Sequence, residues 1–401
     1  MKILFVQNRF YPAIGGAERH TYLLSKYLAK KGHEVTVYTT TSLSKDDVLS
    51  IALSPPFFVK PKINANLPKE EFIEIFTVKR FDMRLRFWSF NWIPEMFKKL
   101  KATAHEFDII HAHGYHISSS LAGCYYAKKC KKPFILTAHD LIIPDDLPTD
   151  AKLFKKIYDK TFGRYLLKNS TRLIALTEDQ IQQYAERGGD VSKIRIIPNG
   201  IELDKYRNAK TNPDIIAKYG IDDVDKVLLF VGRIDKYKGI QDVIEAMPVI
   251  LSKHHNIKFI VVGGDYGYKS ELKKLSEKLN VDKSVVFTGN ISKEELIELY
   301  KRADIFVFPS KMEGFGIVLL EAIASGTLCI AYSIPSVRKI IKDNENGVLV
   351  KNKNELLDKI LYYLDNVEEK KKIETNAFKY VENYDIKSII TKLVMIYEEI
   401  Y

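Results

Sequence analysis

Short apolar runs alternate with helix-like segments along nearly the whole of this 401-residue chain. Two of these runs, Asp108–Ile110 and Arg172–Leu176, have the nearly continuous apolar character of strands that are covered on both faces. Strands that alternate with helices favour a parallel sheet, because each parallel crossover needs a connection long enough for a helix. The pattern therefore predicts an α/β fold.

The strand-like runs fall into two series that are separated by a polar stretch. The first series comprises Ile3–Gln7, Val35–Thr40, Asp108–His113, Phe134–His139, Leu173–Thr177 and Ile194–Pro198. Residues 205–225 then turn polar and lack strong periodicity, which is typical of a connection between domains. The second series comprises Val227–Gly232, Lys258–Gly263, Val285–Gly289, Ile305–Pro309 and Leu328–Ala331.

We expect one domain over residues 1–204 and a second over residues 205–382. A C-terminal helix over residues 383–401 is a candidate for crossing back to the first domain. Helix-like segments such as Lys293–Arg302 lie between the strands. Two similar α/β halves that face each other across a cleft make that cleft the default binding site.

The run from Pro309 to Glu321 combines a carboxylate, two glycines and a predicted helix start. A helix N-terminus offers free N–H groups to a phosphate, and Gly314 and Gly316 let the backbone approach it closely. If the helix begins near Gly316, Glu321 lies about 7 Å further along its axis, roughly the offset between a diphosphate and its ribose diol. Glu313 precedes the turn, where an attached sugar would lie. The run therefore suits a nucleoside diphosphate that is joined to a hydroxyl-rich group.

Two cations, Arg233 and Lys238, follow a predicted strand of the second half. Positive charges at this edge of the sheet would neutralise a diphosphate and stabilise negative charge as it leaves. Taken alone, both could equally be solvated surface charges. The Pro309–Glu321 run in the same half favours the binding role.

The first strand leads to a turn that contains Gly15 and Gly16, where the backbone could approach a ligand. A tight turn without any ligand would have the same sequence. The turn does not match the G-x-G-x-x-G pattern, and the second strand ends in Thr39–Thr41, not in an acidic residue that would hold an adenosine ribose. This argues against a dinucleotide-dependent oxidoreductase.

Two histidines end neighbouring predicted strands of the first half. His113 ends one strand, and His139, followed by Asp140, ends another. His139 with Asp140 could orient a sugar hydroxyl or act as an acid–base pair, and a buried structural role is the alternative. No third ligand has a metal-like spacing, so we predict no metal site. Asn199 lies in a turn that closes the first half and could reach the cleft.

The segment Arg80–Lys101 interleaves basic and aromatic side chains and contains both tryptophans, Trp88 and Trp92. This composition suits contact with an anionic membrane surface, although aromatic core residues surrounded by snorkelling cations would look the same. The formal net charge of +11 also favours anionic partners. Nucleic acid is not needed as a partner, because the predicted phosphate site already accounts for an anionic ligand.

The lack of a recognisable targeting signal and the spacing of the cysteines favour a reducing compartment. The apolar run at the N-terminus is too short for a signal peptide, and no run is long enough to span a membrane. The three cysteines have no metal-ligand spacing and are expected to be free thiols. We therefore expect a cytoplasmic protein, with the inner face of the cell membrane as a candidate location.

In these motifs the chain resembles the retaining glycosyltransferases of family 4, which have the GT-B fold. The resemblance covers nearly the whole length and includes, in order, Gly15–Arg19, Gly32–Val35, Gly232–Arg233 with Lys238–Gly239, Phe287–Gly289, and Pro309–Glu321 with its paired glutamates. It implies two Rossmann-like domains, the first on the acceptor side and the second binding the nucleotide sugar. It also implies a hexosyltransferase.

The resemblance implies roles for individual residues. Arg233 and Lys238 would hold the donor diphosphate, and Glu321 would bind the ribose hydroxyls. Glu313 would bind the transferred sugar, and His139 would sit near its reacting face. The remaining implied donor contacts are Gly15, Gly16, Gly289, Gly314, Phe315, Gly316, Ile317 and Val318, with His113 and Asn199 in the vicinity of the sugar and acceptor.

The resemblance further implies a UDP-, GDP- or ADP-sugar as donor, a glycan or lipid-linked acceptor, and no metal or other cofactor. A surface polysaccharide pathway is the expected setting. A nucleotide-sugar epimerase of the same fold and a non-catalytic nucleotide-sugar binder remain the alternatives.

Overall fold

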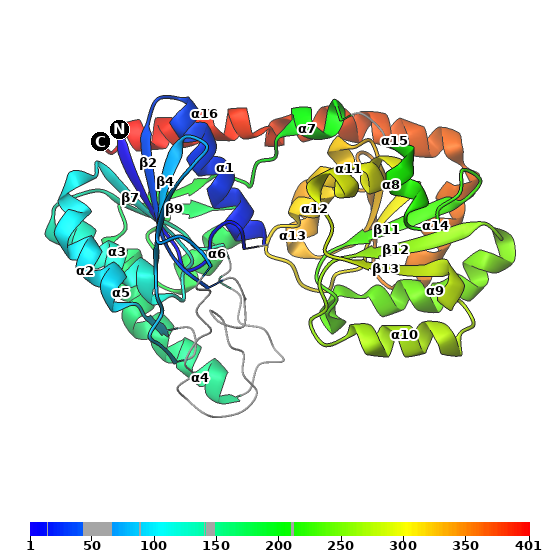
Figure 1. The fold of residues 1–401 in the computed structure, drawn as a ribbon, viewed down its shortest axis with the longest axis horizontal. Coiled ribbons are helices and arrows are strands. Elements are labelled where there is room, and N and C mark those ends of the chain that lie inside the picture. The colour runs from blue at the N-terminus through cyan, green and yellow to red at the C-terminus, as the bar shows by residue number, and fades with distance from the viewer. Residues whose placement is uncertain (14, 43–65, 88–89, 140, 142–148, 210–211) are drawn as a thin grey trace. The chain divides into compact units, whose positions relative to one another are not determined.

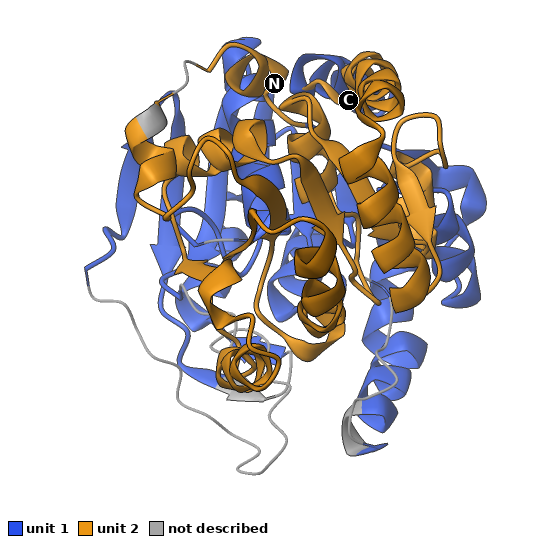
Figure 2. Cartoon of the chain, turned by 90° about the vertical axis from the view of Figure 1, so that its right-hand side faces the viewer, with its two compact units in different colours: residues 1–200, 386–401 blue, residues 201–385 orange. Residues whose placement is uncertain are grey.

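The computed structural model describes residues 1–13, 15–42, 66–87, 90–139, 141, 149–209 and 212–401. The chain divides into two compact units (Figure 2). Unit 1 consists of residues 1–200 together with residues 386–401. Unit 2 consists of residues 201–385.

Unit 1 is built on an eight-stranded sheet (Figure 1). Its spatial order is β10 (Ile194–Ile196), β9 (Arg172–Ala175), β8 (Phe134–Thr137), β7 (Ile109–His113), β1 (Lys2–Val6), β2 (Glu34–Thr40), β4 (Phe76–Phe81) and β3 (Glu70–Ile73). Neighbouring strands are parallel except for the edge strand β3, which runs antiparallel to β4. The chain order reverses on either side of β1, so a topological switch point lies between β1 and β7.

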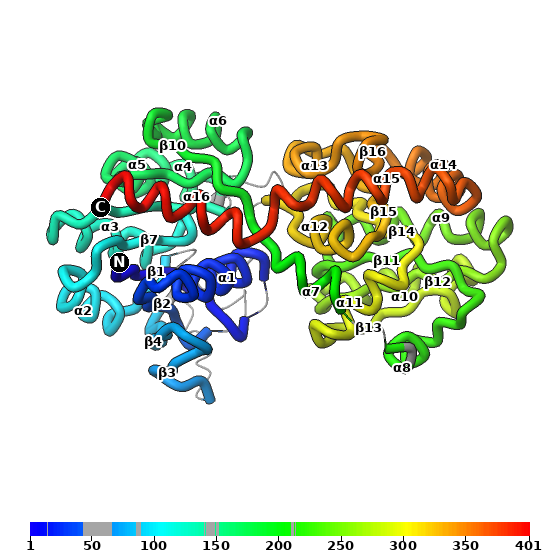
Figure 3. Tube along the Cα trace, turned by 90° about the horizontal axis from the view of Figure 1, so that it is seen from above, coloured from blue at the N-terminus to red at the C-terminus, as the bar shows by residue number. Residues whose placement is uncertain are grey.

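Helices cover both faces of this sheet. On one face, α1 (Gly16–Lys30) and α16 (Ile386–Glu398) lie side by side (Figure 3). The apolar residues of α16 recur every three or four positions and pack with those of α1 into one core cluster. The other core cluster contains residues of α2 (Pro94–Thr103), α3 (Ser118–Lys129), α5 (Arg164–Asn169) and α6 (Asp179–Glu186).

Two further elements belong to unit 1. A small antiparallel hairpin joins β5 (Leu85–Phe87) to β6 (Phe90–Trp92). The helix α4 (Thr149–Tyr158) continues through a π-helical turn (Asp159–Gly163) into α5. The sequence patterns predicted neither of these elements, nor the strands β3 and β4.

Unit 2 contains a six-stranded sheet in which all neighbouring strands are parallel. Its spatial order is β13 (Val285–Gly289), β12 (Ile257–Val262), β11 (Lys226–Val231), β14 (Ile305–Phe308), β15 (Leu328–Tyr332) and β16 (Val348–Val350). The chain order reverses between β11 and β14, which makes this pair the switch point of the second sheet.

The helices of unit 2 also form two layers. In Figure 1, α9 (Ile240–Lys253) and α10 (Lys269–Lys278) lie on one side of the strands. On the other side lie α11 (Lys293–Arg302), α12 (Ile317–Ala324) and α15 (Val367–Tyr380). The remaining helices of unit 2 are α7 (Leu203–Arg207), α8 (Pro213–Ala217), α13 (Pro335–Ile340) and α14 (Lys353–Asp365).

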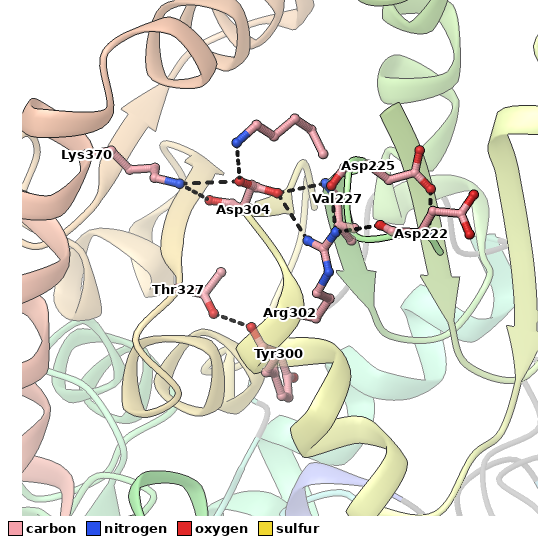
Figure 4. A network of polar contacts seen from close by, with 9 residues as sticks. Asp222, Asp225, Val227, Tyr300, Arg302, Asp304, Thr327 and Lys370 are labelled. Carbon is pink, nitrogen blue, oxygen red and sulfur yellow. Dashed lines mark hydrogen bonds and ion pairs between the residues drawn. The ribbon is translucent and has the colours of Figure 1, made fainter. Parts of the chain in front are cut away.

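The largely buried carboxylate of Asp304 ties the amino ends of β11 and β14 together (Figure 4). Asp304 accepts a hydrogen bond from the backbone N–H of Val227 at 3.0 Å and lies 3.3 Å from the ammonium of Lys226. Lys370 on α15 and Arg302 on α11 each approach the same carboxylate at 3.6 Å. This network fixes one end of the sheet and leaves the carboxyl end for ligands.

The predicted α/β class is confirmed, and so is the parallel arrangement of the predicted strands. Each predicted strand is present within two residues of its expected limits. Among the described residues, no helix has the length and apolar character needed to cross a membrane.

Candidate active site

The switch point of the second sheet brings the two predicted phosphate-binding segments together. Arg233 and Lys238 follow β11, while Pro309 and Glu313 follow the neighbouring strand β14. Because the strands are parallel, both segments leave the same edge of the sheet. This is the usual ligand edge of an α/β sheet.

A glycine allows these two segments to touch. Gly239 has φ of +73°, and a Cβ at this position would lie only 2.0 Å from the carbonyl oxygen of Pro309. The backbone N–H of Lys311 also donates to the carbonyl oxygen of Tyr237 at 2.9 Å. Any side chain at position 239 would separate the turn that carries Lys238 from the end of β14.

Lys238 and Glu313 form an ion pair across these segments. The Lys238 side chain is only 7% exposed, and its ammonium lies 5.7 Å from the centre of the Phe308 ring. The Glu313 side chain is 23% exposed, so the carboxylate keeps contact with solvent. A desolvated cation at this position interacts with an anionic ligand more strongly than a surface lysine would.

Arg233 is held by two tyrosines. Its guanidinium lies 5.2 Å from the centre of the Tyr266 ring and 5.8 Å from that of Tyr237, and it donates a hydrogen bond to the Tyr237 hydroxyl. Burial raises the pKa of Tyr237 to about 12, although the neighbouring Arg233 opposes this shift. The hydroxyl is therefore neutral at physiological pH and can accept this hydrogen bond.

The helix α12 begins directly after the glycine-rich turn. Gly316, its N-cap residue, has φ of +91°, a left-handed conformation that favours glycine. Among the described residues, no side chain caps this end of the helix by a hydrogen bond. The first amides of α12, including those of Ile317 and Val318, thus form a site suited to an anion.

Glu321 lies one turn into α12 and its side chain is only 1% exposed. Its carboxylate accepts a hydrogen bond from the Tyr300 hydroxyl at 3.0 Å and lies 3.7 Å from the ammonium of Lys293. Lys293 in turn contacts Tyr206, whose ring centre lies 4.4 Å from the ammonium. The structure thus places Glu321 in a buried polar cluster of unit 2.

The remaining predicted donor contacts of unit 2 include Gly289, Gly314 and Phe315. Gly289 ends β13 with φ of +73°, and a Cβ there would meet no described atom within 4 Å. The Phe315 side chain is buried, with its ring centre 6.3 Å from that of Tyr384. Only the backbone of Phe315 and of its neighbour Gly314 is therefore suited to line a ligand.

The predicted residues of the first half belong to unit 1. Gly15 and Gly16 form the start of α1, and Asn199 is buried after β10. His113 Nδ1 and His139 Nε2 are 2.8 Å apart and share a hydrogen bond. Asp140, the expected acid–base partner of His139, lies outside the described residues.

The histidine pair is part of a larger buried group that includes His20 on α1 and His111 on β7. The ring centre of His20 lies 5.7 Å from that of His139, and the rings of His111 and His113 stack at 4.5 Å. Burial lowers the pKa of His139 to about 4, and burial together with the nearby His139 lowers the pKa of His111 to about 3. For the same reasons the pKa values of His20 and His113 lie well below the ordinary value.

Four neutral imidazoles therefore lie where β7, β8 and α1 meet. A neutral imidazole donates and accepts hydrogen bonds, which suits the orientation of a sugar hydroxyl better than proton transfer near neutral pH. His139 also has φ of +61°, a strained conformation for a residue other than glycine. Among the described residues, no group of three potential ligands could hold a metal ion.

The sequence patterns did not predict several residues of these clusters. Tyr237 and Tyr266 position Arg233, while Tyr300 and Lys293 contact Glu321. Lys293 and Tyr300 lie seven residues apart on α11 and so share a helix face, but spacing alone could not show what that face meets.

The residues of the segment Arg80–Lys101 differ in their exposure to solvent. Arg80 is buried, donates to the carbonyl oxygen of Tyr11 at 2.8 Å and pairs with Glu71, so it is a structural residue. Trp92 is 49% exposed, whereas Trp88 lies outside the described residues.

Comparisons with known proteins agree with this architecture. A family model described as glycosyl transferases group 1 matches residues 211–380, and one described as glycosyltransferase family 4 matches residues 14–205. A glycosyltransferase of Methanocaldococcus jannaschii is 30% identical over 99% of this chain and 98% of its own length. The alpha-monoglucosyldiacylglycerol synthase of Streptococcus pneumoniae is 30% identical over 90% of this chain and 78% of its own length.

Solved structures share the fold at lower identity. HepE of Anabaena in complex with UDP has a TM-score of 0.77 at 20% identity, and the match covers 100% of both chains. Sucrose-phosphate synthase of Thermosynechococcus elongatus has a TM-score of 0.75 at 21% identity, covering 99% of this chain and 98% of that one. The chain therefore belongs to family 4 of the glycosyltransferases, enzymes of the hexosyltransferase type, and has the GT-B fold.

Proposed function

We propose that this glycosyltransferase moves a hexose from a nucleoside-diphosphate sugar to an acceptor hydroxyl with retention of configuration at the anomeric carbon. The observation that carries this proposal is the meeting of Lys238, Glu313 and the start of α12 at one switch point of unit 2. Cations and helix amides at such a point suit a diphosphate, and an adjacent carboxylate suits sugar hydroxyls.

In this reaction the bond between the anomeric carbon and the diphosphate oxygen breaks, and its electron pair goes to the departing diphosphate. Lys238 and Arg233 stabilise the negative charge that develops there, together with the amides of α12. The acceptor oxygen then bonds to the same face of an oxocarbenium-like sugar. Its proton passes to an oxygen of the departing diphosphate, which explains retention without a protein nucleophile.

We assign Glu313 to the transferred sugar and Glu321 to the ribose. Glu321 already accepts a hydrogen bond from Tyr300, so a ribose diol would join an existing network. The neutral His139 would hydrogen-bond to a sugar hydroxyl, with His113 fixing the imidazole through Nε2. Gly15 and Gly16 are assigned to the phosphate and Asn199 to the acceptor vicinity, as the family resemblance implies.

The relatives support the donor and acceptor classes that we propose. HepE was solved with UDP and with UDP-glucose, so a UDP-hexose is the donor we propose, ahead of GDP- and ADP-sugars. The Streptococcus pneumoniae relative is a synthase of a glycolipid by name, which supports a lipid-linked or glycan acceptor. Two cations and a helix end can neutralise the diphosphate, so we propose that the transfer needs no metal.

Peripheral contact with an anionic membrane at the inner face of the cell membrane is part of this proposal. The exposed side chains of Trp92, Lys98 and Lys101 support such contact in the segment Arg80–Lys101. Buried Arg80 is not among the residues that would make it.

The test is an assay of the purified chain with a panel of UDP-, GDP- and ADP-sugars and of glycan and glycolipid acceptors. We expect one UDP-hexose to give a product whose new linkage has the anomeric configuration of the donor, as read by nuclear magnetic resonance. An inverted linkage would contradict retention. An altered sugar formed without acceptor would identify an epimerase, and binding without turnover would identify a non-catalytic nucleotide-sugar binder.

A further inference from the structure

The first turn of α1 carries a carboxylate that folds back over the N-cap residue of the helix. Gly15 is that N-cap residue, and its φ of 170° is extended backbone that any residue adopts. A Cβ at this position would nevertheless lie only 2.1 Å from Oε2 of Glu18. Position 15 therefore accepts only glycine while the Glu18 carboxylate stays in this place.

Arg9 holds that carboxylate in place. Its Nη1 lies 3.2 Å from Oε1 of Glu18, and the two side chains are 7% and 13% exposed. Arg9 lies just after β1, next to Asn8. The carbonyl oxygen of Asn8 accepts hydrogen bonds from the backbone N–H of Thr40 on β2 at 3.2 Å and from its hydroxyl at 2.6 Å. The ion pair thus ties the first turn of α1 to a fixed point at the carboxyl end of β1.

The start of α1 remains open beside this ion pair. Gly16 is exposed, and a Cβ there would meet no described atom within 4 Å. Among the described residues, no side chain caps this end of α1 by a hydrogen bond. A lone carboxylate in the first turn would use the positive end of the helix dipole itself and repel another anion. Because Arg9 compensates the charge of Glu18, this end of α1 can accept a second anion.

We propose that Arg9 is a positioning residue for the donor diphosphate and acts through Glu18. This role rests on the proposed function, in which Gly15 and Gly16 contact the phosphate. Arg9 holds the Glu18 carboxylate against Gly15 and cancels a negative charge that would otherwise repel the diphosphate. Neither side chain has to touch the donor. A purely structural tie between β1 and α1 is the alternative that the experiment must separate from this role.

The test is calorimetric titration of UDP and of uridine into the parent chain and into Arg9→Met, which needs no turnover. We expect Arg9→Met to bind UDP roughly tenfold more weakly, because the uncompensated Glu18 carboxylate repels the diphosphate. Uridine carries no phosphate, so its affinity should not change. The loss of UDP affinity should become smaller as salt is added, since salt screens the repulsion.

A second substitution separates charge compensation from a structural tie. Arg9→Met/Glu18→Gln removes both charges, so its affinity for UDP should return to within roughly threefold of the parent value. A structural tie would be lost in this double variant as well, and its UDP affinity would then stay as low as that of Arg9→Met. Glu18→Gln alone keeps Arg9 and should bind UDP roughly two- to fivefold more tightly than the parent. This single variant also tests the role if Arg9→Met does not fold.

Lys26→Met is the matched control. Lys26 also lies on α1, its side chain is 11% exposed, and its ammonium lies 2.8 Å from the carboxylate of Glu74. The control therefore loses a similar ion pair of the same helix, and its affinity for UDP should equal that of the parent. Thermal unfolding of each variant shows whether a change in affinity accompanies a loss of stability.

Four results would overturn the role of Arg9. These are parent-like UDP affinity in Arg9→Met, an equal loss of uridine affinity in that variant, no recovery in Arg9→Met/Glu18→Gln, and weaker UDP binding by Glu18→Gln. If the parent chain transfers a sugar while one of these results is found, the proposed function stands and only the role of Arg9 fails. A parent chain that does not bind UDP would contradict both.

Discussion

The ammonium of Lys238 pairs with the carboxylate of Glu313 at the switch point of the second sheet, beside the ring of Phe308. The cation proposed for the diphosphate and the anion proposed for the sugar therefore compensate each other's charge. A diphosphate that enters would share Lys238 with Glu313. This ion pair holds the Lys238 side chain in place for a diphosphate.

Lys238→Ala should lower kcat by roughly 100- to 1000-fold with a smaller effect on KM, because the lysine acts most strongly on charge that develops during the reaction. The loss of stability should stay below the roughly 3–5 kcal/mol of a fully buried pair, since the Glu313 side chain is 23% exposed. Steady-state kinetics and urea unfolding measure the two effects. Lys236→Ala, at an exposed position two residues earlier, is the control that should change neither. An unchanged kcat in Lys238→Ala would remove the lysine from the transition state.

Glu313→Gln should bind free UDP more tightly than the parent chain while losing most of its turnover. The substitution removes the charge that competes with the diphosphate for Lys238, so we expect a gain of roughly two- to tenfold, or about 0.4–1.4 kcal/mol. Calorimetric titration with UDP measures the affinity. Weaker UDP binding would show that Glu313 orients Lys238 productively and does not compete for it.

Gly239→Ala should disrupt the site more than other glycine substitutions do. A Cβ there would lie 2.0 Å from the carbonyl oxygen of Pro309 at the end of β14, so the turn carrying Lys238 must move. Gly220→Ala is the matched control, because Gly220 has φ of +65° and a Cβ would meet no described atom within 4 Å. The control should cost about 1–2 kcal/mol from backbone strain and keep its activity. Equal activity losses in the two variants would contradict the close approach.

Unit 1 should lose stability as the pH falls below the ordinary histidine value. Burial lowers the pKa values of His111 and His139 from 6.5 to about 3 and about 4, so the unfolded chain binds protons that the folded chain resists. The stability is fully present above pH 6.5 and is lost as the pH falls from there toward 4 and 3. Each such histidine contributes a slope of about 1.4 kcal/mol per pH unit.

Tryptophan fluorescence can follow this loss specifically, because both tryptophans, Trp88 and Trp92, belong to unit 1. Urea unfolding at a series of pH values should show a smaller slope for His113→Gln than for the parent chain. His255→Gln, at an exposed position on unit 2, should leave the slope unchanged. A parent chain whose tryptophan transition is independent of pH between 6.5 and 4 would contradict the burial of uncharged imidazoles.

The sequence predicted most of the fold because buried parallel strands carry a strong apolar signal. The helix Lys293–Arg302 has its predicted limits, since Ser292 and Glu295 form a capping box and a basic residue ends it. The edge strand β3 was missed because its apolar residues are partly exposed and weakly patterned. The hairpin of β5 and β6 was missed because each of its strands has only three residues.

The sequence predicted those features of the candidate site that depend on residues adjacent in the chain. Gly316 and the start of α12 could be read from the glycine-rich run, because a left-handed glycine and a helix start are local features. The partners of Arg233 and Glu321 could not be read in this way. Tyr266, in the loop after β12, contacts Arg233, and Tyr300 on α11 contacts Glu321. Only the packing of the sheet brings these segments together.

Titration of UDP and of uridine into the parent chain and into Arg233→Ala/Lys238→Ala tests the diphosphate site most directly. Uridine lacks the phosphates, so its affinity should be the same for both proteins. UDP should bind the double variant at least roughly 100-fold more weakly, because two cations that face the diphosphate are gone. Equal affinity for UDP in the two proteins would contradict the account.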